Sequence, residues 1–339
     1  MDSVIYKYFL CFSWSFLLTL FAIPPIINLA YRKRLLDTPN GRTVHESNVP
    51  RLGGMAIFAG FVSGVTIFSD FTVEKGIQQL LAGVVLLFFI GLKDDVKPVS
   101  AFKKFFVQVL CCGIVMFLGG VRIVSFYGMF GIHELSLELS YVVTFVAIIG
   151  VTNAINLIDG VNGLAGSIVI IIASFLSVVL IINGSPYTVV AVALIGAMIG
   201  FLRYNLFKGA IFMGDTGSLV SGFTLIVLAI HSLKFESNGF SPIFVLSVFA
   251  WPILDTLRVM VIRTLNGQSP FSPDQKHIHH VLLRKGLSHP MVVATVVFIQ
   301  VLMVLSIWFF RSFDGYIQFL CLLGEAILLL LIVWRIEKN

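Results

Sequence analysis

The chain has 339 residues, of which 58% are hydrophobic and only 12% are charged, and its formal net charge is +6. Soluble globular proteins carry about 25% charged residues, so this composition excludes an ordinary soluble domain and indicates an integral membrane protein. The basic residues are spread over short loops between apolar runs instead of forming one basic face, which argues against a nucleic-acid-binding protein.

About eleven apolar runs approach the length of about 20 residues that a membrane-spanning helix needs. They lie at residues 6–30, 50–69, 77–92, 102–120, 138–155, 161–183, 187–202, 217–232, 240–262, 290–310 and 315–334. Only short turns separate several of them, so we predict an all-α polytopic protein in which residues 1–339 form a single membrane domain. The first run lacks a small-residue cleavage site and is expected to be a span. The four cysteines all lie in apolar runs and are expected to be buried thiols.

The basic residues predict the orientation of the chain in the membrane. One set of loops, together with the C-terminal end, holds 18 of the 23 Lys and Arg residues. These loops lie near residues 31–51, 93–104, 153–160, 203–215 and 258–289. Because cytoplasmic loops are enriched in Lys and Arg, we expect this side to be cytoplasmic, with the N-terminus outside and the C-terminus inside.

Four polar motifs fall in loops on this predicted cytoplasmic side. They are GLKDDVKPVS (91–100), NAINLIDGVNGLAG (153–166), FMGDTGSL (212–219) and SPDQKHIHH (272–280). Ionisable residues next to the bilayer are costly unless they are paired or functional. The convergence therefore predicts a single active site at the cytoplasmic membrane surface.

Asp94 and Asp95 are adjacent at the end of an expected helix. Neighbouring residues on a helix point about 100° apart, so we expect these two carboxylates to have different partners.

Asn153, Asn156 and Asp159 are spaced three residues apart, which puts them on one face of a helix end. Gly160 and Gly163 follow and allow a tight turn. We interpret the three side chains as polar groups of the active site. The alternative is that they form interhelical hydrogen bonds within the bundle.

FMGDTGSL opens an apolar run, so we expect a helix to begin there with Thr216 or Ser218 as its cap. The free amides at such a helix start favour a phosphate. Asp215 would then be a natural ligand for a Mg²⁺ ion held against that phosphate. The alternative is an ordinary capped helix.

His277, His279 and His280 are too close in sequence to ligate one zinc ion together easily. Protonatable imidazoles among basic residues fit pyrophosphate binding better. The alternative is a solvated loop.

Two further groups of charged or polar residues lie near the same predicted surface. Lys104, with Gln108 one turn later on the same helix face, can meet the phosphate of a lipid or simply anchor the helix end. Asp255 and Arg258 are spaced for a structural ion pair, and the alternative is that Asp255, which lies close to the inner face, takes part in the site.

Taken together, these motifs resemble the polyprenyl-phosphate N-acetylhexosamine-1-phosphate transferases, the family that includes bacterial MraY and WecA. The resemblance runs in order through PNGRTVHESNVPRLGG (39–54), GLKDDVKPVSAFKK (91–104), NAINLIDGVNGLAG (153–166), NLFKGAIFMGDTGSL (205–219) and SPFSPDQKHIHH (269–280). The HIHH sequence is closer to the WecA and TagO branch than to the muropeptide branch.

The resemblance implies transfer of a sugar 1-phosphate from a UDP-sugar to a polyprenyl phosphate, which gives a polyprenyl-diphosphate sugar and UMP. It also implies a requirement for Mg²⁺, with Mn²⁺ as a substitute, and a location in the bacterial cytoplasmic membrane with the site on the cytoplasmic face. The expected partners are the UDP-sugar and the lipid, with no nucleic acid. The oligomeric state stays open, with a homodimer as one option by analogy.

The resemblance also implies roles for individual residues. Asp215 and Asn156 would hold the Mg²⁺ ion. The implied catalytic residues are Asp94, Asp95, Asp159, His277, His279 and His280. Of the aspartate pair, one would face the metal–phosphate centre and the other the lipid phosphate or a lysine such as Lys104, with Asp94 favoured as the general base. The implied substrate contacts are Lys104, Asn153, Asn205 and Phe212, with Asn205 and Phe212 at the uracil.

The chain departs from the family pattern at Asn162, where members often have a second aspartate in DGxDG. UDP-GlcNAc is the default donor, and this amide leaves a modified N-acetylhexosamine open. Pro98 stands where a DDxxD prenyltransferase would need its third aspartate. The remaining alternatives are another phosphotransferase acting on lipid substrates and a secondary transporter, which would have its polar residues near the bilayer midplane.

Overall fold

The computed structural model describes residues 2–36, 48–72, 76–238, 241–270 and 275–338. Within them the chain forms α-helices, three short helical turns of other types and one isolated β-bridge between Ser125 and Glu134. The α-helices are α1 (Asp2–Lys33), α2 (Gly53–Phe68), α3 (Gly76–Val96), α4 (Ala101–Gly113), α5 (Leu137–Leu157), α6 (Leu164–Ile182), α7 (Thr188–Asn205), α8 (Gly214–Ser232), α9 (Pro242–Val248), α10 (Ala250–Leu265), α11 (Ile278–Arg284), α12 (His289–Phe309) and α13 (Gly315–Lys338). The π-helix η1 (Ile114–Leu118) extends α4, and η2 (Met129–Gly131) and η3 (Leu233–Asn238) are 3-10 turns.

The predicted all-α membrane architecture is confirmed. Among the described residues, nine helical segments are long and apolar enough to cross a bilayer, and the bent pair α9–α10 would make ten. The remaining predicted span corresponds to α2, which has only 16 residues. The predicted span over 240–262 is not one continuous helix, because α9 and α10 meet at an angle of 72°.

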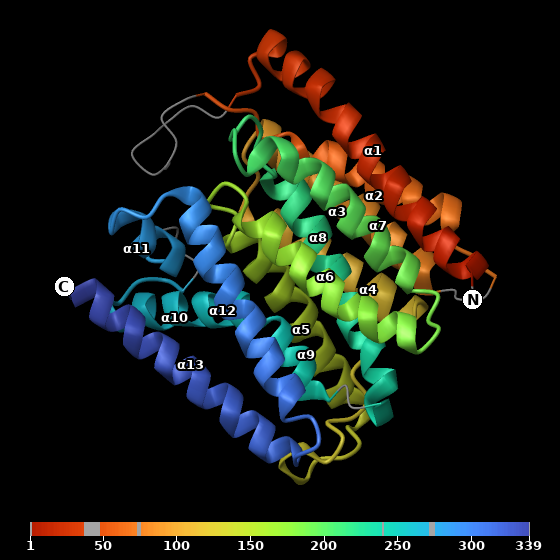
Figure 1. The fold of residues 1–339 in the computed structure, drawn as a ribbon, viewed down its shortest axis with the longest axis vertical. Coiled ribbons are helices and arrows are strands. Elements are labelled where there is room, and N and C mark those ends of the chain that lie inside the picture. The colour runs from red at the N-terminus through yellow and green to blue at the C-terminus, as the bar shows by residue number, and fades with distance from the viewer. Residues whose placement is uncertain (1, 37–47, 73–75, 239–240, 271–274, 339) are drawn as a thin grey trace.

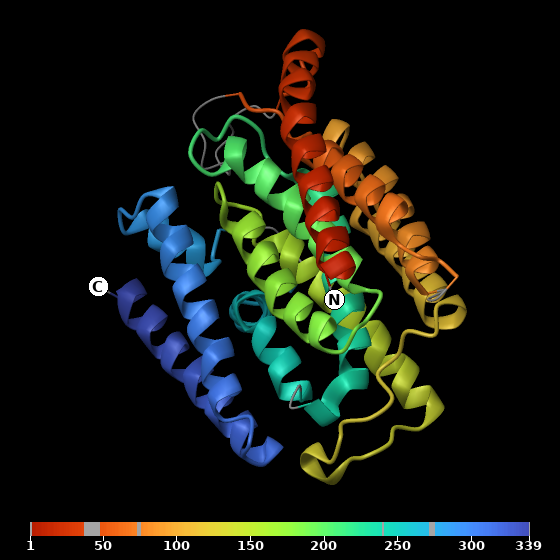
Figure 2. The same ribbon diagram turned by 45° about the vertical axis from the view of Figure 1, so that its right-hand side comes forward.

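Helix α8 lies at the centre of the bundle, where α2, α3, α5 and α6 pack around it (Figures 1 and 2). Apart from Asp215, all its residues are buried. Small residues let its neighbours come close: a Cβ added to Gly222 would lie 3.0 Å from the Thr152 backbone of α5. Lipid tails are as apolar as the helix surfaces, so the hydrophobic effect does not hold membrane helices together. Close packing of this kind is therefore a main source of stability in a membrane bundle.

Helix α1 packs against α2 and α7 through small residues on all three helices. A Cβ on Gly60 of α2 would lie 2.1 Å from Thr19 Oγ1 and 2.6 Å from the Ser15 carbonyl oxygen. A Cβ on Gly196 of α7 would lie 2.5 Å from the Phe12 carbonyl oxygen. The backbones of these helices are therefore almost in contact.

Replacing Gly60 by Leu is expected to lower the thermal unfolding midpoint in detergent, because α1 must move away from α2. Overpacking of this kind costs about 1–3 kcal/mol. The matched control is Gly150→Leu, since a Cβ on Gly150 would meet nothing within 4 Å. Equal midpoints for the two variants would contradict the close packing of α1 on α2.

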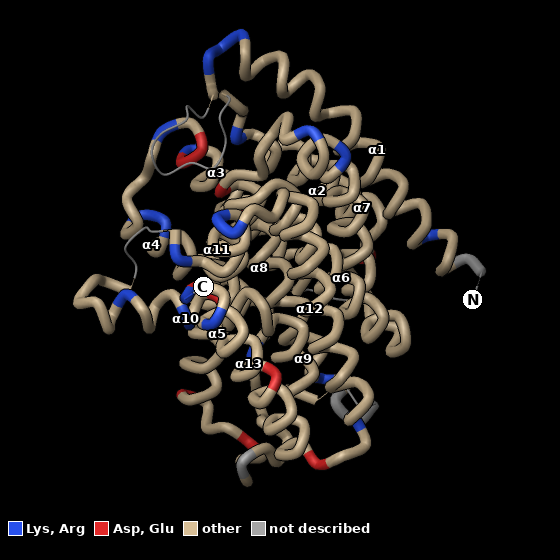
Figure 3. The backbone as a smooth tube through the Cα atoms, turned by 60° about the vertical axis from the view of Figure 1, so that its left-hand side comes forward, with Lys and Arg blue, Asp and Glu red and all other residues tan. Residues whose placement is uncertain are grey.

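The loops predicted to be cytoplasmic lie at one end of the bundle, together with α11 and the C-terminal end (Figure 1). Most of the Lys and Arg residues also lie toward this end (Figure 3). The opposite end holds the segment with η2 and the turn between α12 and α13 (Figure 1). Three of the cysteines are buried and Cys321 is half-buried, and all four are free thiols.

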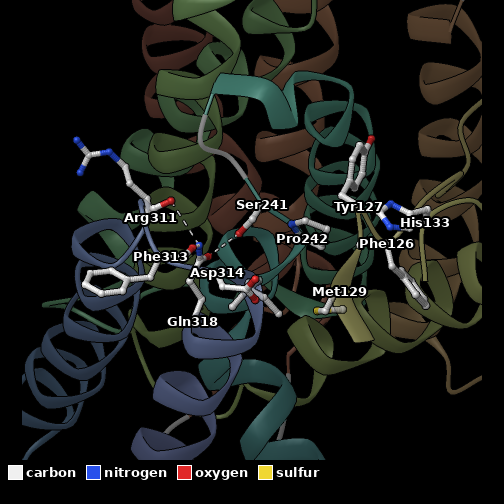
Figure 4. A pocket seen from close by; sticks show the side chains of 13 residues that line it. Phe126, Tyr127, Met129, His133, Ser241, Pro242, Arg311, Phe313, Asp314 and Gln318 are labelled. Atoms are coloured by element: carbon white, nitrogen blue, oxygen red, sulfur yellow. Dashed lines mark hydrogen bonds between the residues drawn. The ribbon is translucent and has the colours of Figure 1, made fainter. Parts of the chain in front are cut away.

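A cavity of about 390 Å³ opens at this opposite end (Figure 4). It is lined by residues of the segment around η2, the start of α9 and the turn between α12 and α13. Buried Gln318 joins two of its walls, because its Oε1 accepts a hydrogen bond from Ser241 Oγ (2.8 Å) and its Nε2 donates to the Phe313 carbonyl oxygen (3.0 Å). None of the residues predicted for the active site lines this cavity.

Candidate active site

Asp95, in the last turn of α3, caps the N-terminus of α8. Its Oδ1 accepts a hydrogen bond from the Asp215 amide (2.8 Å), and its Oδ2 accepts from the Thr216 amide (3.0 Å) and the Thr216 hydroxyl (2.5 Å). The prediction that Thr216 or Ser218 caps α8 is therefore wrong. The carboxylate of a neighbouring helix already takes the free amides, and the Ser218 hydroxyl donates back to the Gly214 carbonyl oxygen (2.9 Å).

Glycines bring the backbone close enough for this cap. Gly214 has φ of +70°, which strains any L residue, and a Cβ there would lie 2.6 Å from the Asp95 carboxylate oxygens. A Cβ on Gly91 of α3 would lie 2.6 Å from Thr216 Cα. The glycines therefore fix the distance between the end of α3 and the start of α8.

Lys104 of α4 links two carboxylates across three helices. Its Nζ lies 2.9 Å from Asp215 Oδ2 and 3.3 Å from Asp94 Oδ2. Asp94 Oδ1 also accepts a hydrogen bond from the Val99 amide (2.6 Å) in the α3–α4 turn. Asp94 and Asp95 thus point to different partners, as expected for adjacent helical residues, and the predicted contact between an aspartate of the pair and Lys104 is confirmed for Asp94.

The amides of the predicted polar stripe on α5 bind neighbouring helices. Asn153 exchanges hydrogen bonds with Gln108 of α4, at 3.0 and 3.3 Å, so both ends of its amide are used. Asn156 Nδ2 donates to Ser218 Oγ of α8 (2.8 Å). The alternative interpretation, interhelical hydrogen bonds, therefore holds for Asn153 and for the NH₂ group of Asn156, whereas Asn156 Oδ1 accepts no hydrogen bond from the described residues.

Asp159 lies in the turn after α5, next to the other carboxylates. Burial, together with the charges of Asp95 and Asp215, raises its pKa to about 7, and a hydrogen bond from the Gly214 amide and the charge of Arg51 oppose the rise. By exposed area the side chain is only half-buried, but its carboxyl group is largely surrounded by protein atoms. Three carboxyl groups from separate segments thus interact electrostatically at one end of the bundle.

The residues proposed for the uracil lie at the end of α7 and in the loop before α8. Asn205 is buried, its Oδ1 accepts from the Gly163 amide (2.6 Å) and its Nδ2 donates to the Ile211 carbonyl oxygen (2.8 Å). Both ends of its amide thus join two loops, and one N–H and one lone pair of the oxygen are left for another partner. Phe212 is half-buried, and its backbone pairs with Pro50 and Gly53.

The HIHH segment packs on the turn that carries Asp159. The rings of His277 and His279 are stacked at 5.5 Å, and those of His279 and His280 lie 4.3 Å apart. A Cβ on Gly160 would be 2.8 Å from His279 Nε2 and 3.4 Å from the His280 ring. Burial lowers the pKa of His279 to about 3, so this imidazole is neutral near pH 7 and not the cation that the sequence analysis predicts.

The predicted ion pair between Asp255 and Arg258 is wrong. Asp255 Oδ2 instead lies 2.9 Å from His277 Nδ1, and Arg258 binds Glu337 near the end of α13 and the Lys276 carbonyl oxygen (2.7 Å). Helical spacing allowed the pair, but each side chain has a partner from a distant segment that holds it in another direction. Residues 39–47 of the first motif and 271–274 of the last lie outside the described residues.

Comparison with known proteins assigns the chain to a family. The profile of glycosyl transferase family 4 matches residues 77–233, a range that includes α3 to α8 and all four site aspartates. A probable undecaprenyl-phosphate N-acetylglucosaminyl 1-phosphate transferase of Bacillus subtilis (strain 168) is 36% identical over 283 residues, which cover 83% of this chain and 78% of that protein. The chain belongs to glycosyl transferase family 4. This confirms the resemblance drawn from the motifs.

Other members of glycosyl transferase family 4 agree with this assignment. The decaprenyl-phosphate N-acetylglucosaminephosphotransferase of Mycobacterium tuberculosis (strain ATCC 25618 / H37Rv) is 32% identical over 306 residues, covering 82% of this chain and 76% of that protein. The undecaprenyl-phosphate alpha-N-acetylglucosaminyl 1-phosphate transferase of Escherichia coli (strain K12) is 31% identical over 267 residues, covering 77% and 72%.

The site of this family 4 member fits a Mg²⁺ ion by its chemistry. The described residues contain no group of three His, Cys, Asp or Glu side chains close enough to hold a metal together. Mg²⁺, however, often takes only one or two carboxylates and completes its shell with water and substrate phosphate oxygens. The Asp215 carboxylate and Asn156 Oδ1, which has no hydrogen-bond donor among the described residues, are oxygen ligands of this kind. The Lys104 ammonium lies beside the Asp215 carboxylate, which shows that this position attracts a positive charge.

Several contacts of this family 4 site were not predicted from the sequence. Arg51 acts on Asp159, Ser218 holds Asn156, and Asp255 binds the HIHH segment. Arg51 lies within the PRLGG part of a quoted motif, which was the one available signal. Ser218 and Asp255 had been assigned to other local roles, and their partners lie far away in the sequence.

Proposed function

We propose that the protein transfers N-acetylglucosamine 1-phosphate from UDP-GlcNAc to a polyprenyl phosphate, giving a polyprenyl-diphosphate sugar and UMP. The observation that carries this is the convergence of Asp94, Asp95, Asp159, Asp215 and Lys104 at one end of the bundle, within the range matched to the family. The names of the relatives supply the sugar and the class of lipid acceptor.

The main obstacle to this reaction is repulsion between anions. An oxygen of the lipid phosphate attacks the sugar-bearing phosphorus of the UDP-sugar, and the bond from that phosphorus to the bridging oxygen breaks as UMP leaves. Lys104 is placed to offset negative charge on the phosphates, and Asp94 Oδ2 can take the proton of the acceptor phosphate. A Mg²⁺ ion held by Asp215 and Asn156, with Mn²⁺ as a substitute, would neutralise further charge on the diphosphate.

We also propose that this site faces the cytoplasm from a bacterial inner membrane. The excess of Lys and Arg in the loops at this end of the bundle supports that orientation. A UDP-sugar is a cytoplasmic metabolite that cannot cross a bilayer unaided, so a site at this end has direct access to it.

The proposal is tested with the purified protein in detergent, UDP-[¹⁴C]GlcNAc and undecaprenyl phosphate. Radiolabel should enter an organic-extractable lipid only when the lipid acceptor and Mg²⁺ are both present, and EDTA should abolish the transfer until Mg²⁺ or Mn²⁺ is restored. A panel of UDP-N-acetylhexosamines identifies the sugar. Labelled UDP-sugar that accumulates inside proteoliposomes with no labelled lipid would instead indicate a transporter.

A further inference from the structure

The bend between α9 and α10 has a local chemical cause. Pro252 has no amide hydrogen, so it cannot bond to the Val248 carbonyl oxygen four residues earlier. Buried Gln300 of α12 replaces that bond, because its Nε2 donates to the carbonyl oxygens of Val248 (3.1 Å) and Ser247 (2.9 Å). Its Oε1 accepts from the Trp251 amide (3.0 Å). The bend is thus hydrogen-bonded, and it sets the direction in which α10 leaves the bundle.

Asp255 lies one turn beyond Pro252 and is completely buried (0% exposed). Its Oδ2 is 2.9 Å from His277 Nδ1, and its Oδ1 accepts from the Ile278 amide (2.8 Å) at the start of α11. His279 Nδ1 is 3.8 Å from the same Oδ2. A buried carboxylate is costly unless its oxygens are satisfied, and here the partners come from the HIHH segment.

The contact with Asp255 determines where the remaining histidines lie. His279 is fully buried against Gly160, and neither of its ring nitrogens has a hydrogen-bond partner among the described residues. Buried polar atoms without partners are rare in folded proteins and point to a group that is not part of the chain. Asp255 contacts His277, the His277 ring stacks on His279, and His279 packs on Gly160. Gly160 directly follows Asp159, so this series of contacts connects Asp255 to the carboxylates of the site.

A second contact attaches the same segment to α10. Arg258, one turn after Asp255, donates to the Lys276 carbonyl oxygen (2.7 Å) immediately before His277. Both contacts come from α10, whose direction is set by the bend. The HIHH segment is therefore attached to α10 at two successive turns and rests on the Asp159 turn on its other side.

We infer that Asp255 is a positioning residue for the transferase reaction: its carboxylate fixes His277 and the HIHH segment against the Asp159 turn. This inference rests on the proposed function. The carboxylate requires a hydrogen on His277 Nδ1, so in the neutral ring Nε2 is an acceptor. Asp255 itself is remote from solvent and acts only through the histidines.

Asp255→Asn tests this role with little change in shape. The amide oxygen can still accept from the Ile278 amide, but the amide NH₂ then faces His277 Nδ1 and forces the ring to change tautomer or turn. We expect kcat to fall about 10–100-fold, as for other groups that orient a functional histidine, with an unchanged unfolding midpoint. Wild-type kcat in a folded Asp255→Asn protein would overturn the inference.

A double-mutant cycle separates positioning from general destabilisation. If Asp255 acts through His277, adding Asp255→Asn to a His277→Asn protein should cause no further loss of kcat. If the double mutant instead loses kcat by the product of the two single-mutant factors, the inference is overturned. Gly60→Leu is the control for destabilisation: it disturbs the contact between α1 and α2, where α10 takes no part, so it should lower the unfolding midpoint and any effect it has on kcat should multiply with that of His277→Asn.

The tautomer of His277 can be measured without any change at position 255. In ¹⁵N-histidine NMR of the intact protein, with the His277 signal identified by its loss in His277→Asn, Nδ1 should carry a proton. A bare Nδ1 would overturn the inference even if Asp255→Asn fails to fold. This measurement needs no turnover, so absence of activity in the wild-type protein would count against the proposed function alone.

Discussion

Replacing Asp215 by Ala is expected to abolish transfer of the sugar phosphate while the protein stays folded. Asp215 caps α8 through its backbone amide, which donates to Asp95 and is unaffected by the substitution. Its side chain faces Lys104 at 2.9 Å and is 23% exposed. Removing the side chain therefore removes a ligand from the proposed cation site, while few packing contacts are lost. Loss of one such electrostatic contact typically lowers kcat by about 10²–10³.

The measurement is the initial rate of labelled lipid formation across a Mg²⁺ titration, beside the thermal unfolding midpoint. Asp215→Asn, which keeps the shape and removes the charge, should lose nearly as much activity as Asp215→Ala. Asp70→Ala is the control, since Asp70 is an exposed aspartate at the opposite end whose hydrogen bonds within the described part of the chain all go to Thr72. Activity retained by Asp215→Ala at saturating Mg²⁺ would refute the assignment of Asp215 as the metal ligand.

The sequence was enough to predict the helices because membrane spans are specified locally. A run such as 164–182 is almost entirely apolar, and in hydrocarbon its backbone has no alternative to helical hydrogen bonds. The same reasoning did not predict the bend within 240–262. Pro252 indicated a break in the helix. The angle between α9 and α10, however, depends on the hydrogen bonds of Gln300, which is 48 residues away and is placed by the packing of α12.

The site was predicted as a set of residues, whereas its internal contacts were not. Helical spacing suggested that Asp255 would bind Arg258, although both have partners outside α10. It also suggested a cap from Thr216 or Ser218, although the cap comes from Asp95, 120 residues away from Asp215 in the chain. Local rules find groups that can interact, and only the tertiary structure decides between a partner on the same helix and one on another.

Replacing Asp95 by Ala is expected to destabilise the whole bundle as well as inactivate it. Three donors, the amides of Asp215 and Thr216 and the Thr216 hydroxyl, lose their acceptor at the N-terminus of the central helix. Loss of a helix cap costs about 1 kcal/mol, and unsatisfied buried donors add about 1–3 kcal/mol. We expect the thermal unfolding midpoint in detergent to fall clearly, because α8 contacts helices on every side.

Asp94→Ala is the informative comparison, because it changes the neighbouring aspartate of the same turn. Asp94 accepts from one loop amide and pairs with Lys104, which keeps Asp215 as a partner. We therefore expect Asp94→Ala to lose activity while its unfolding midpoint stays nearly unchanged. Asp95→Ala should lose activity and also have a lower unfolding midpoint. If the two variants unfold at the same temperature, the carboxylate of Asp95 does not hold α8 in place. Only its proposed part in the chemistry would then explain why two aspartates stand side by side at the end of α3.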